Sequence, residues 1–412
     1  MSTFQDKIEI YADIALKVGV NLQKDQTLYI STPLYAAEFV RIIAKKAYQA
    51  GAKHVHVEWN DEELTRLKFE LASEASLSEF PNWKVQALVE EAENNAAFLR
   101  ISESGGDPDL LKDIEPDRIS TENKTRSKAL SKFRSYTQFD KVSWSIVAVP
   151  SVKWAEKVFP DSKGKKAVDK LWEALFSATR VNKPNPITAW HNHLQTLDEK
   201  MQFLNAKHYH ALHFQAKGTD LTIELPETHI WEAGGSVNKE GVNFVANIPT
   251  EEVFTAPKKE GVNGTVSSTK PLNYGGILIN DFKLTFENGK VVSYNAKEGE
   301  ETLRRLLESD EGASYIGEIA LVPYSSHISD MNLIFFNTLL DENASTHLAL
   351  GSAYPINIEG GNGMKKKELE EKGINTSITH VDFMIGTADM SIDGIHKDGT
   401  RETIFRNGGW AS

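Results

Sequence analysis

The sequence of 412 residues contains no cysteine. This absence excludes disulfide bonds, thiolate zinc sites and cysteine nucleophiles. It is also typical of proteins that work in a reducing compartment. We therefore expect a cytoplasmic protein whose chemistry depends on oxygen and nitrogen groups.

Long apolar runs are also missing. No stretch approaches the roughly 20 consecutive apolar residues of a transmembrane helix. Residues 1–18 include Asp6, Glu9 and Asp13, and they lack the basic segment and apolar core of a signal peptide. We therefore expect no membrane partner.

Positive charge is in deficit, since 46 Lys and Arg residues stand against 58 Asp and Glu residues and the net charge is −12. Such a chain repels the phosphate backbone of nucleic acids. A short basic run at 365–367 is followed at once by Glu368, Glu370 and Glu371, as on a solvated helix face. We expect no nucleic acid partner.

Familiar catalytic motifs are absent as well. The sequence has no Gly-x-Ser-x-Gly nucleophile elbow, no Gly-x-x-x-x-Gly-Lys phosphate loop and no His-Glu-x-x-His zinc helix.

The first half of the chain alternates helix and strand patterns. Apolar residues at spacings of three and four predict helices, and short runs of strand-forming residues predict buried strands. Strands separated by helices favour an α/β fold with a doubly wound, mostly parallel sheet. The expected helices cover 4–18, 36–50 and 85–94, and the expected strands cover 27–30, 54–59, 97–101 and 145–149.

The second half has a different character. Asn288-Gly289 lies between two strand patterns, and because both residues tolerate positive φ it predicts a hairpin. We predict an α+β domain with antiparallel strands. A segment at 181–186 with two prolines indicates a linker before a long helix at 187–206, which divides the chain into domains 1–186 and 187–412. The expected strands cover 221–225, 282–286, 291–294, 381–385 and 403–405.

His380 and Asp382 are the sharpest candidates for a site. In a strand, residues two apart point to the same face, so the imidazole and the carboxylate would lie side by side. A divalent cation requires such a pair. The same residues could instead form a His–Asp hydrogen bond on an exposed strand face, and the pattern alone leaves both interpretations open.

Glu342 and His347 form a second combination, with Tyr354 shortly after them. The spacing of five residues is poor for one face of a regular helix. Both side chains can serve one site only if the chain turns between them, and Glu342 could equally be a surface residue.

Three further glutamates lie in apolar or constrained surroundings. Glu318 stands at the head of an apolar strand pattern, where a buried carboxylate needs a cation or hydrogen-bond partners. Glu251 and Glu252 are adjacent in a segment between two prolines. In an extended chain they face opposite ways, so at most one of them would reach a shared site.

Seven other histidines, which lie in two pairs and a looser cluster, lack a carboxylate at a matching spacing. His191 and His193 lie two apart on the expected helix, about 200° around its axis, so they cannot chelate one ion together. We expect structural roles for this whole set, namely His54, His56, His191, His193, His208, His210 and His213.

Two long segments resemble the aminopeptidase T and aminopeptidase S family of metallo-aminopeptidases, which includes PepS. They are Asn-Ile-Pro-Thr-Glu-Glu-Val-Phe-Thr-Ala-Pro at 247–257 and His-Val-Asp-Phe-Met-Ile-Gly at 380–386. The resemblance covers essentially the whole chain, including the helix with Tyr11-Ala12. It implies a homodimer of two-domain subunits with an enclosed active site, and short peptides with a free N-terminus as substrates.

The resemblance also implies residue roles. Glu318 would bridge two metal ions, and Tyr354 would lie at the catalytic centre. The metal ligands would be Glu252, Glu318, Glu342, His347, His380 and Asp382. Independently of the resemblance, general acid–base chemistry calls for a glutamate that moves the proton, and Glu251 and Glu318 are the candidates.

Nitrogen and oxygen ligands suit Zn, Co, Mn or Mg ions. Two such ions can activate a water for attack on a peptide carbonyl. We therefore predict a metallo-aminopeptidase. The alternatives are a two-metal phosphoester hydrolase and a peptide-binding protein with a structural cation.

Overall fold

The computed structural model describes residues 3–102, 107, 110–274 and 277–411. The chain divides into two compact units, one of Met1–Leu194 with Gly234–Thr250 and the other of Gln195–Ala233 with Glu251–Ser412. The units divide within helix α10 (Pro186–Lys207), whereas we predicted the division at its start. The chain also returns once to the first unit.

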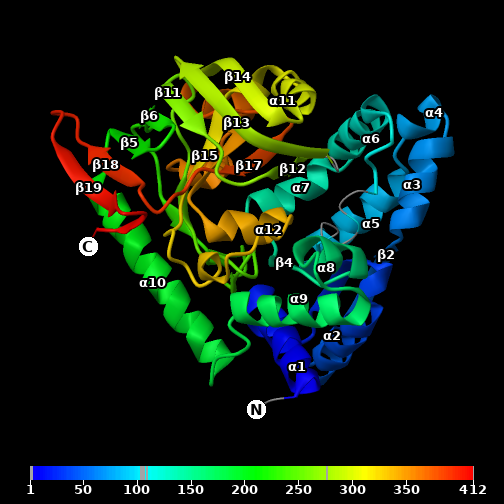
Figure 1. Cartoon of the computed structure of the whole chain (residues 1–412). Helices are drawn as coiled ribbons and strands as arrows, with labels where there is room; N and C mark the ends of the chain where they lie inside the picture. Colours follow the sequence, from blue (N-terminus) through cyan, green and yellow to red (C-terminus); the bar gives the residue numbers. More distant parts are fainter. Residues whose placement is uncertain (1–2, 103–106, 108–109, 275–276, 412) are drawn as a thin grey trace. The chain divides into compact units, whose positions relative to one another are not determined.

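The first unit contains the predicted parallel sheet. Its strand order is β2-β1-β3-β4, and every neighbouring pair is parallel (Figure 1). The order changes direction at β1, as in doubly wound folds. The bounds are β1 Thr27–Pro33, β2 His54–Asn60, β3 Ala97–Ile101 and β4 Trp144–Val147.

Helices cover both faces of this sheet. Tyr29 on β1 packs in an apolar cluster with residues of α5 and α7, so its neighbours Leu28 and Ile30 face the other side and are buried there. The rings of Tyr11 and Phe39 stack at 5.2 Å and join α1 to α2, which packs on β1 and β2. The doubly wound prediction is therefore confirmed.

The helices of the first unit also include short ones that we did not predict. None of the helices in the described residues is both long and apolar enough to span a membrane. The bounds are α1 Phe4–Ile14, α2 Ala37–Gln49, α3 Glu62–Leu71, α4 Glu74–Leu77, α5 Asn82–Glu93, α6 Pro116–Ala129, α7 Ser131–Gln138, α8 Val152–Val158 and α9 Gly164–Ala178, with strands β8 Ser236–Val237 and β9 Asn243–Phe244.

The second unit is built on two antiparallel sheets. A five-stranded sheet has the order β17-β16-β15-β10-β7, and a nine-stranded sheet includes β13, β14, β5 and β18. One apolar core cluster takes residues from both sheets, and the rings of Phe282 and Phe383 meet across it at 5.4 Å. The prediction of antiparallel α+β structure is confirmed.

In its described part, the second unit contains the strands of both sheets and three α-helices that follow α10. The five-stranded sheet comprises β7 Glu232–Ala233, β10 Val253–Thr255, β15 Ile316–Leu321, β16 His347–Gly351 and β17 His380–Met384. The nine-stranded sheet comprises β5 Ala211–Ala216, β6 Thr219–Glu224, β11 Val262–Ser267, β12 Leu272–Tyr274, β13 Ile277–Glu287, β14 Lys290–Glu298, β18 Ser391–Ile395, β19 Arg401–Arg406 and β20 Gly409–Trp410, and the helices are α11 Glu300–Leu307, α12 Thr338–Asp341 and α13 Lys366–Glu371.

The predicted hairpin joins β13 to β14. Asn288 and Gly289 have φ values of 48° and 84°, as a two-residue loop between twisted strands requires. A Cβ atom at Gly289 would lie 1.7 Å from the carbonyl oxygen of Lys259, so only glycine fits there.

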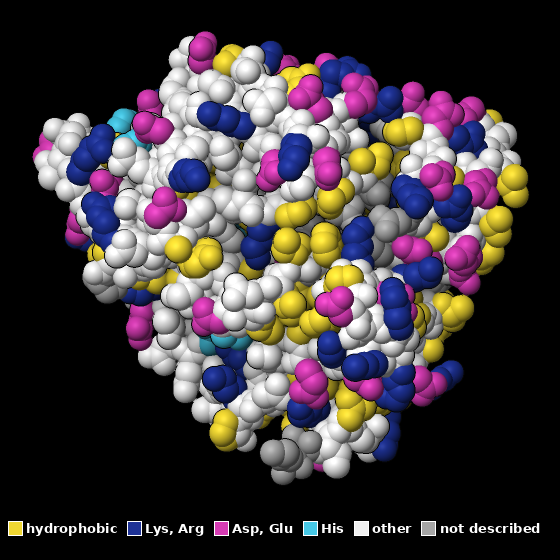
Figure 2. Space-filling view, in the orientation of Figure 1, with side chains coloured by type: hydrophobic (Ala, Val, Ile, Leu, Met, Phe, Trp, Pro, Cys, Tyr) yellow, Lys and Arg dark blue, Asp and Glu magenta, His cyan; other side chains and the backbone are white. Residues whose placement is uncertain are grey.

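Charges of both signs are mixed on the surface. On the face in Figure 2, the described Lys and Arg side chains are interspersed with Asp and Glu side chains. The described part of that face carries no continuous basic stripe.

Candidate metal centre

One face of the five-stranded sheet is apolar. Ile319, Leu348 and Phe383 lie in register on three neighbouring strands and belong to the core cluster. Because side chains alternate along a strand, the residues on either side of each project from the opposite face.

The opposite face carries the charged groups, separated by small residues. Glu318 on β15 pairs with Ala349 on β16, and Ala349 pairs with Asp382 on β17. In the next row, Ala320 pairs with His347. The two alanines leave room on this face between the carboxylates and the imidazole.

A bulge in β15 brings Glu318 to this face. Ile316 pairs with Leu350 and Glu318 pairs with Ala349, so two residues that are two apart project from opposite faces. Gly317 is the extra residue, and a Cβ atom there would lie 2.4 Å from the carbonyl oxygen of Gly351. If Gly317 were paired like an ordinary strand residue, the Glu318 carboxylate would point into the apolar core.

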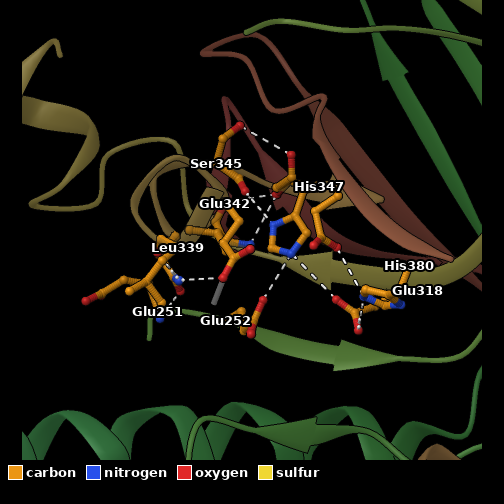
Figure 3. A network of polar contacts seen from close by, with 12 residues as sticks. Glu251, Glu252, Glu318, Leu339, Glu342, Ser345, His347 and His380 are labelled. Atoms are coloured by element: carbon orange, nitrogen blue, oxygen red, sulfur yellow. Dashed lines mark hydrogen bonds and ion pairs between the residues drawn. The ribbon is translucent and has the colours of Figure 1, made fainter. Parts of the chain in front are cut away.

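The Glu318 carboxylate lies between two imidazoles (Figure 3). Its Oε1 is 3.6 Å from His347 Nε2, and its Oε2 is 3.8 Å from His380 Nε2. Glu252 Oε2 is 3.1 Å from His347 Nε2, and Asp382 Oδ1 is 3.3 Å from His380 Nε2. The side chains form two possible donor sets that share Glu318, and within each set the donor atoms lie within 4.8 Å of one another.

The orientation of the histidines fits a cation. His347 Nδ1 lies 3.1 Å from the Ser345 carbonyl oxygen, and His380 Nδ1 lies 2.7 Å from that of Ser352. A carbonyl oxygen only accepts, so each Nδ1 carries a hydrogen, and in a neutral ring Nε2 points its lone pair at the carboxylates.

The carboxylate atoms that face these nitrogens are buried. Glu252 Oε2 and Asp382 Oδ1 have no hydrogen-bond partner of acceptable geometry, although each is close to an imidazole nitrogen. The lone pairs of these oxygens and of the imidazole nitrogens face one another. Such an arrangement requires a positive charge between them, either a proton or a metal ion.

Negative charge dominates the cluster. Burial raises the pKa of Glu318, and burial together with the charges of Asp382 and Glu252 raises that of Glu342. Burial alone would lower the pKa of His380, but the Asp382 carboxylate outweighs it and raises this pKa to about 10. The site therefore favours any bound cation.

Glu342 and Tyr354 lie beside the cluster. Glu342 begins a 3₁₀ turn (Glu342–Ala344) that precedes β16, so the chain turns before His347 as a shared site requires. Glu342 is buried but belongs to neither donor set in the described residues. The Tyr354 ring is 4.8 Å from the His380 ring, and burial, then the Glu318 charge, raises the tyrosine pKa.

Glu251 points away from the donor sets. Its Oε1 lies 3.7 Å from His327 Nδ1, whereas the adjacent Glu252 faces His347. The sequence analysis did not identify His327 or Asn343, whose side chain accepts a hydrogen bond from the Glu251 N–H. A lone histidine and a lone asparagine carry no spacing signal that could have pointed to them.

The other histidines have different partners. His56 contacts Glu91 at 2.9 Å, His213 contacts Asp220 at 2.8 Å, and His208 stacks on His229. None of these joins a set of three metal-binding side chains in the part of the chain that the structure describes.

A buried cluster of carboxylates and imidazoles on a two-unit α/β fold is characteristic of a metal-dependent hydrolase. Residues 4–410 match the thermophilic metalloprotease (M29) family, and the chain belongs to this family. It is therefore a metal-dependent peptidase, and the predicted family is confirmed.

Relatives with known names match over the full length. Aminopeptidase AmpS of Bacillus subtilis (strain 168) is 54% identical, covering 100% of both chains, and aminopeptidase 2 of Geobacillus stearothermophilus is 52% identical, covering 100% of this chain and 99% of the relative. The structure of wild-type AmpT from Thermus thermophilus is similar with a TM-score of 0.93 and 40% identity, covering 100% of both chains.

Proposed function

We propose that this chain is an aminopeptidase that uses two divalent metal ions to remove N-terminal residues from short peptides. One observation carries the proposal: Glu318 offers one carboxylate oxygen to each of two donor sets that contain an imidazole. The family supports the peptidase class, and the names of the relatives support the choice of an aminopeptidase.

In this proposal each donor set holds one ion and Glu318 bridges both. The formal charges support two ions rather than one, since four carboxylates face two neutral imidazoles and two divalent cations would balance them. Nitrogen and oxygen donors without sulfur suit Zn, Co, Mn or Mg. The proposed ligands are Glu252, Glu318, Glu342, His347, His380 and Asp382.

Bound cations would lower the pKa of a water so that hydroxide is available for attack, and they would polarise the peptide carbonyl. The Tyr354 phenol would donate a hydrogen bond to the carbonyl oxygen as negative charge develops there, a contribution of about 3 kcal/mol at comparable centres. The water oxygen joins the carbonyl carbon, the C–N bond breaks, and the proton of the water passes to the leaving amine.

A glutamate must carry that proton, and Glu251 and Glu318 are the two candidates. Glu251→Gln and Glu318→Gln separate them. The proton carrier loses turnover when its carboxylate becomes an amide even though metal remains bound, whereas a bridging ligand loses metal as well. Metal content and kcat should be measured on the same samples.

The function is tested by measuring metal content per chain together with hydrolysis of a panel of amino-acid arylamides. We expect about two ions per chain, loss of activity in excess chelator, recovery with added divalent ion, and no cleavage of an N-acetylated peptide. Full activity in chelator would exclude a metal mechanism. Turnover of phosphoesters but not peptides, or one tightly held ion without turnover, would favour the two alternatives.

We also propose a homodimer, on the basis of the family resemblance. Analytical ultracentrifugation at micromolar concentration tests it, since a sedimenting species with the mass of one chain would contradict it.

A further inference from the structure

We propose that Asn343 is a positioning residue that holds Glu252 and Glu342 in place for metal binding. The inference rests on the proposed function, because it concerns two of the proposed ligands. Asn343 lies in the turn between Glu342 and His347, and it is completely buried.

The Asn343 carboxamide links two segments that are distant in sequence. Its Oδ1 accepts a hydrogen bond of 2.7 Å from the backbone N–H of Glu251. Its Nδ2 donates a bond of 2.9 Å to the Leu339 carbonyl oxygen and lies 3.4 Å from Glu342 Oε1. One side chain therefore contacts the backbone beside one proposed ligand and the carboxylate of another.

These contacts explain how adjacent glutamates take different directions. Because the Glu251 N–H is held by Asn343, the backbone at this position is fixed, and successive side chains of an extended segment diverge. In Figure 3 Glu251 lies on the side of Leu339, and Glu252 lies toward His347. Loss of this anchor would let the Glu252 segment shift relative to His347.

The Asn343 amide also supports the side chain of Glu342. This glutamate belongs to neither donor set, so it must reach the ions from the edge of the cluster. The Asn343 Nδ2 group donates a hydrogen bond of 3.4 Å to the buried Oε1 of Glu342, and a buried carboxylate without any donor is strongly disfavoured. Asn343 thus keeps Glu342 beside the cluster.

Aspartate and alanine at this position would each lose part of this set of contacts. Aspartate keeps the acceptor for the Glu251 N–H but loses both donated hydrogens and adds a negative charge next to Glu342. Alanine loses all three contacts and leaves the Glu251 N–H and the Leu339 carbonyl without this partner in a dry interior.

Asn343→Ala is the main test, and Asn205→Ala is its matched control. Asn205 lies in the same unit and also makes two backbone bonds with its amide, accepting from Trp231 N–H at 2.8 Å and donating to Trp231 O at 2.9 Å, so both bonds go to a residue that is not a proposed ligand. Both variants and the native protein should be titrated with Co²⁺ or Zn²⁺, and kcat and KM should be measured on one arylamide.

For Asn343→Ala we expect metal affinity to fall by about 10- to 100-fold, as for other residues that support ligands, and kcat to fall similarly while KM changes by less than about threefold. Asn205→Ala should bind metal and turn over like the native protein. Excess metal should partly restore Asn343→Ala, and circular dichroism in the absence of metal should show a folded chain, because metal binding could also rescue an unstable fold.

The inference is overturned if Asn343→Ala matches Asn205→Ala in metal affinity and kcat. If Asn343→Ala does not fold, the isosteric Asn343→Asp decides in its place, with weakened metal binding expected and native binding contradicting the inference. Failure of the proposed function looks different, because the native protein itself would then show no metal-dependent peptidase activity.

Discussion

Two regions of this protein place a histidine against a glutamate, with opposite consequences. In the first unit His56 Nδ1 lies 2.9 Å from Glu91, and in the second unit His347 Nε2 lies 3.1 Å from Glu252. The contacts are equally close. The His56 side chain is 48% exposed, whereas that of His347 is 1% exposed and faces a second carboxylate, Glu318.

The difference shows that burial and convergence, rather than contact, distinguish a metal site from a surface ion pair. An exposed pair is solvated by water and contributes about 0–1 kcal/mol to stability. Several carboxylates buried together repel one another, so their arrangement is unfavourable unless a cation joins them. The buried cluster in the second unit is therefore best explained as a cation-binding site.

The largest effect should separate His347→Ala from His56→Ala. Removal of the buried ligand should lower kcat/KM by about a thousandfold, because several kcal/mol of transition-state stabilisation by metal are lost. His56→Ala should leave activity within about twofold, since it removes only an exposed pair. Equal activities of the two variants in an arylamide assay would contradict the claim that only the His347 region is needed for catalysis.

Metal removal should give the next largest effect. Ions bound only by the folded chain stabilise it by about 3–4 kcal/mol when their concentration exceeds the dissociation constant by 100- to 1,000-fold. Excess chelator should therefore lower the melting temperature of the native protein in a calorimetric scan. In His347→Ala the chelator should cause a clearly smaller shift, and an unchanged shift would place the responsible ion elsewhere.

A smaller effect should come from Asp140, a half-buried carboxylate of the first unit. Burial raises its pKa to about 6, although Trp144 Nε1 donates a hydrogen bond to it. Because the folded-state pKa is above the unfolded value of 3.8, the folded form binds more protons between these values and stability falls as pH rises through about 4 to 6.

Asp140→Asn removes this titration and keeps an acceptor for Trp144. The asparagine also tolerates the positive φ of 47° at this position. We expect the variant to be more stable by about 1 kcal/mol near pH 7, with no difference below about pH 4. Thermal melting across this pH range checks the sign, and a variant that is less stable at neutral pH would contradict it.

The smallest effect should be that of His56→Ala on stability, about 0.5 kcal/mol or less. Chelator should lower its melting temperature by as much as it lowers that of the native protein, because the cluster in the second unit is intact. A smaller shift in this variant would show that the first region also binds an ion.

The fold was largely predictable because its elements are locally encoded. The strand at 97–101 and the Asn288-Gly289 hairpin follow from short apolar patterns and from turn residues that tolerate positive φ. The return of 234–250 to the first unit was not predictable. It depends on long-range backbone bonds, such as Val245 N–H to Gly19 O and Ile146 N–H to Ala246 O, which leave no local pattern.

The candidate site was predictable only in part. Alternation along one strand placed His380 and Asp382 side by side, and the structure has them 3.3 Å apart. The convergence of Glu252 and Glu318 on His347 joins three segments, and the sequence alone gives no distance between them. Their metal-binding roles stay predictions, and so do those of Glu342 and Tyr354.

The bulge at Gly317 changes which residues of strand β15 face the core: the in–out alternation of side chains before Gly317 is out of step with the alternation after it. Ile316 keeps the phase that fills the core, and everything after Gly317 is shifted by one position. If Gly317 were paired as an ordinary strand residue, Glu318 and Ala320 would turn inward and Ile319 and Leu321 would be exposed, inverting the strand from that point on. The bulge is thus as much a part of the site as the identity of the glutamate that follows it.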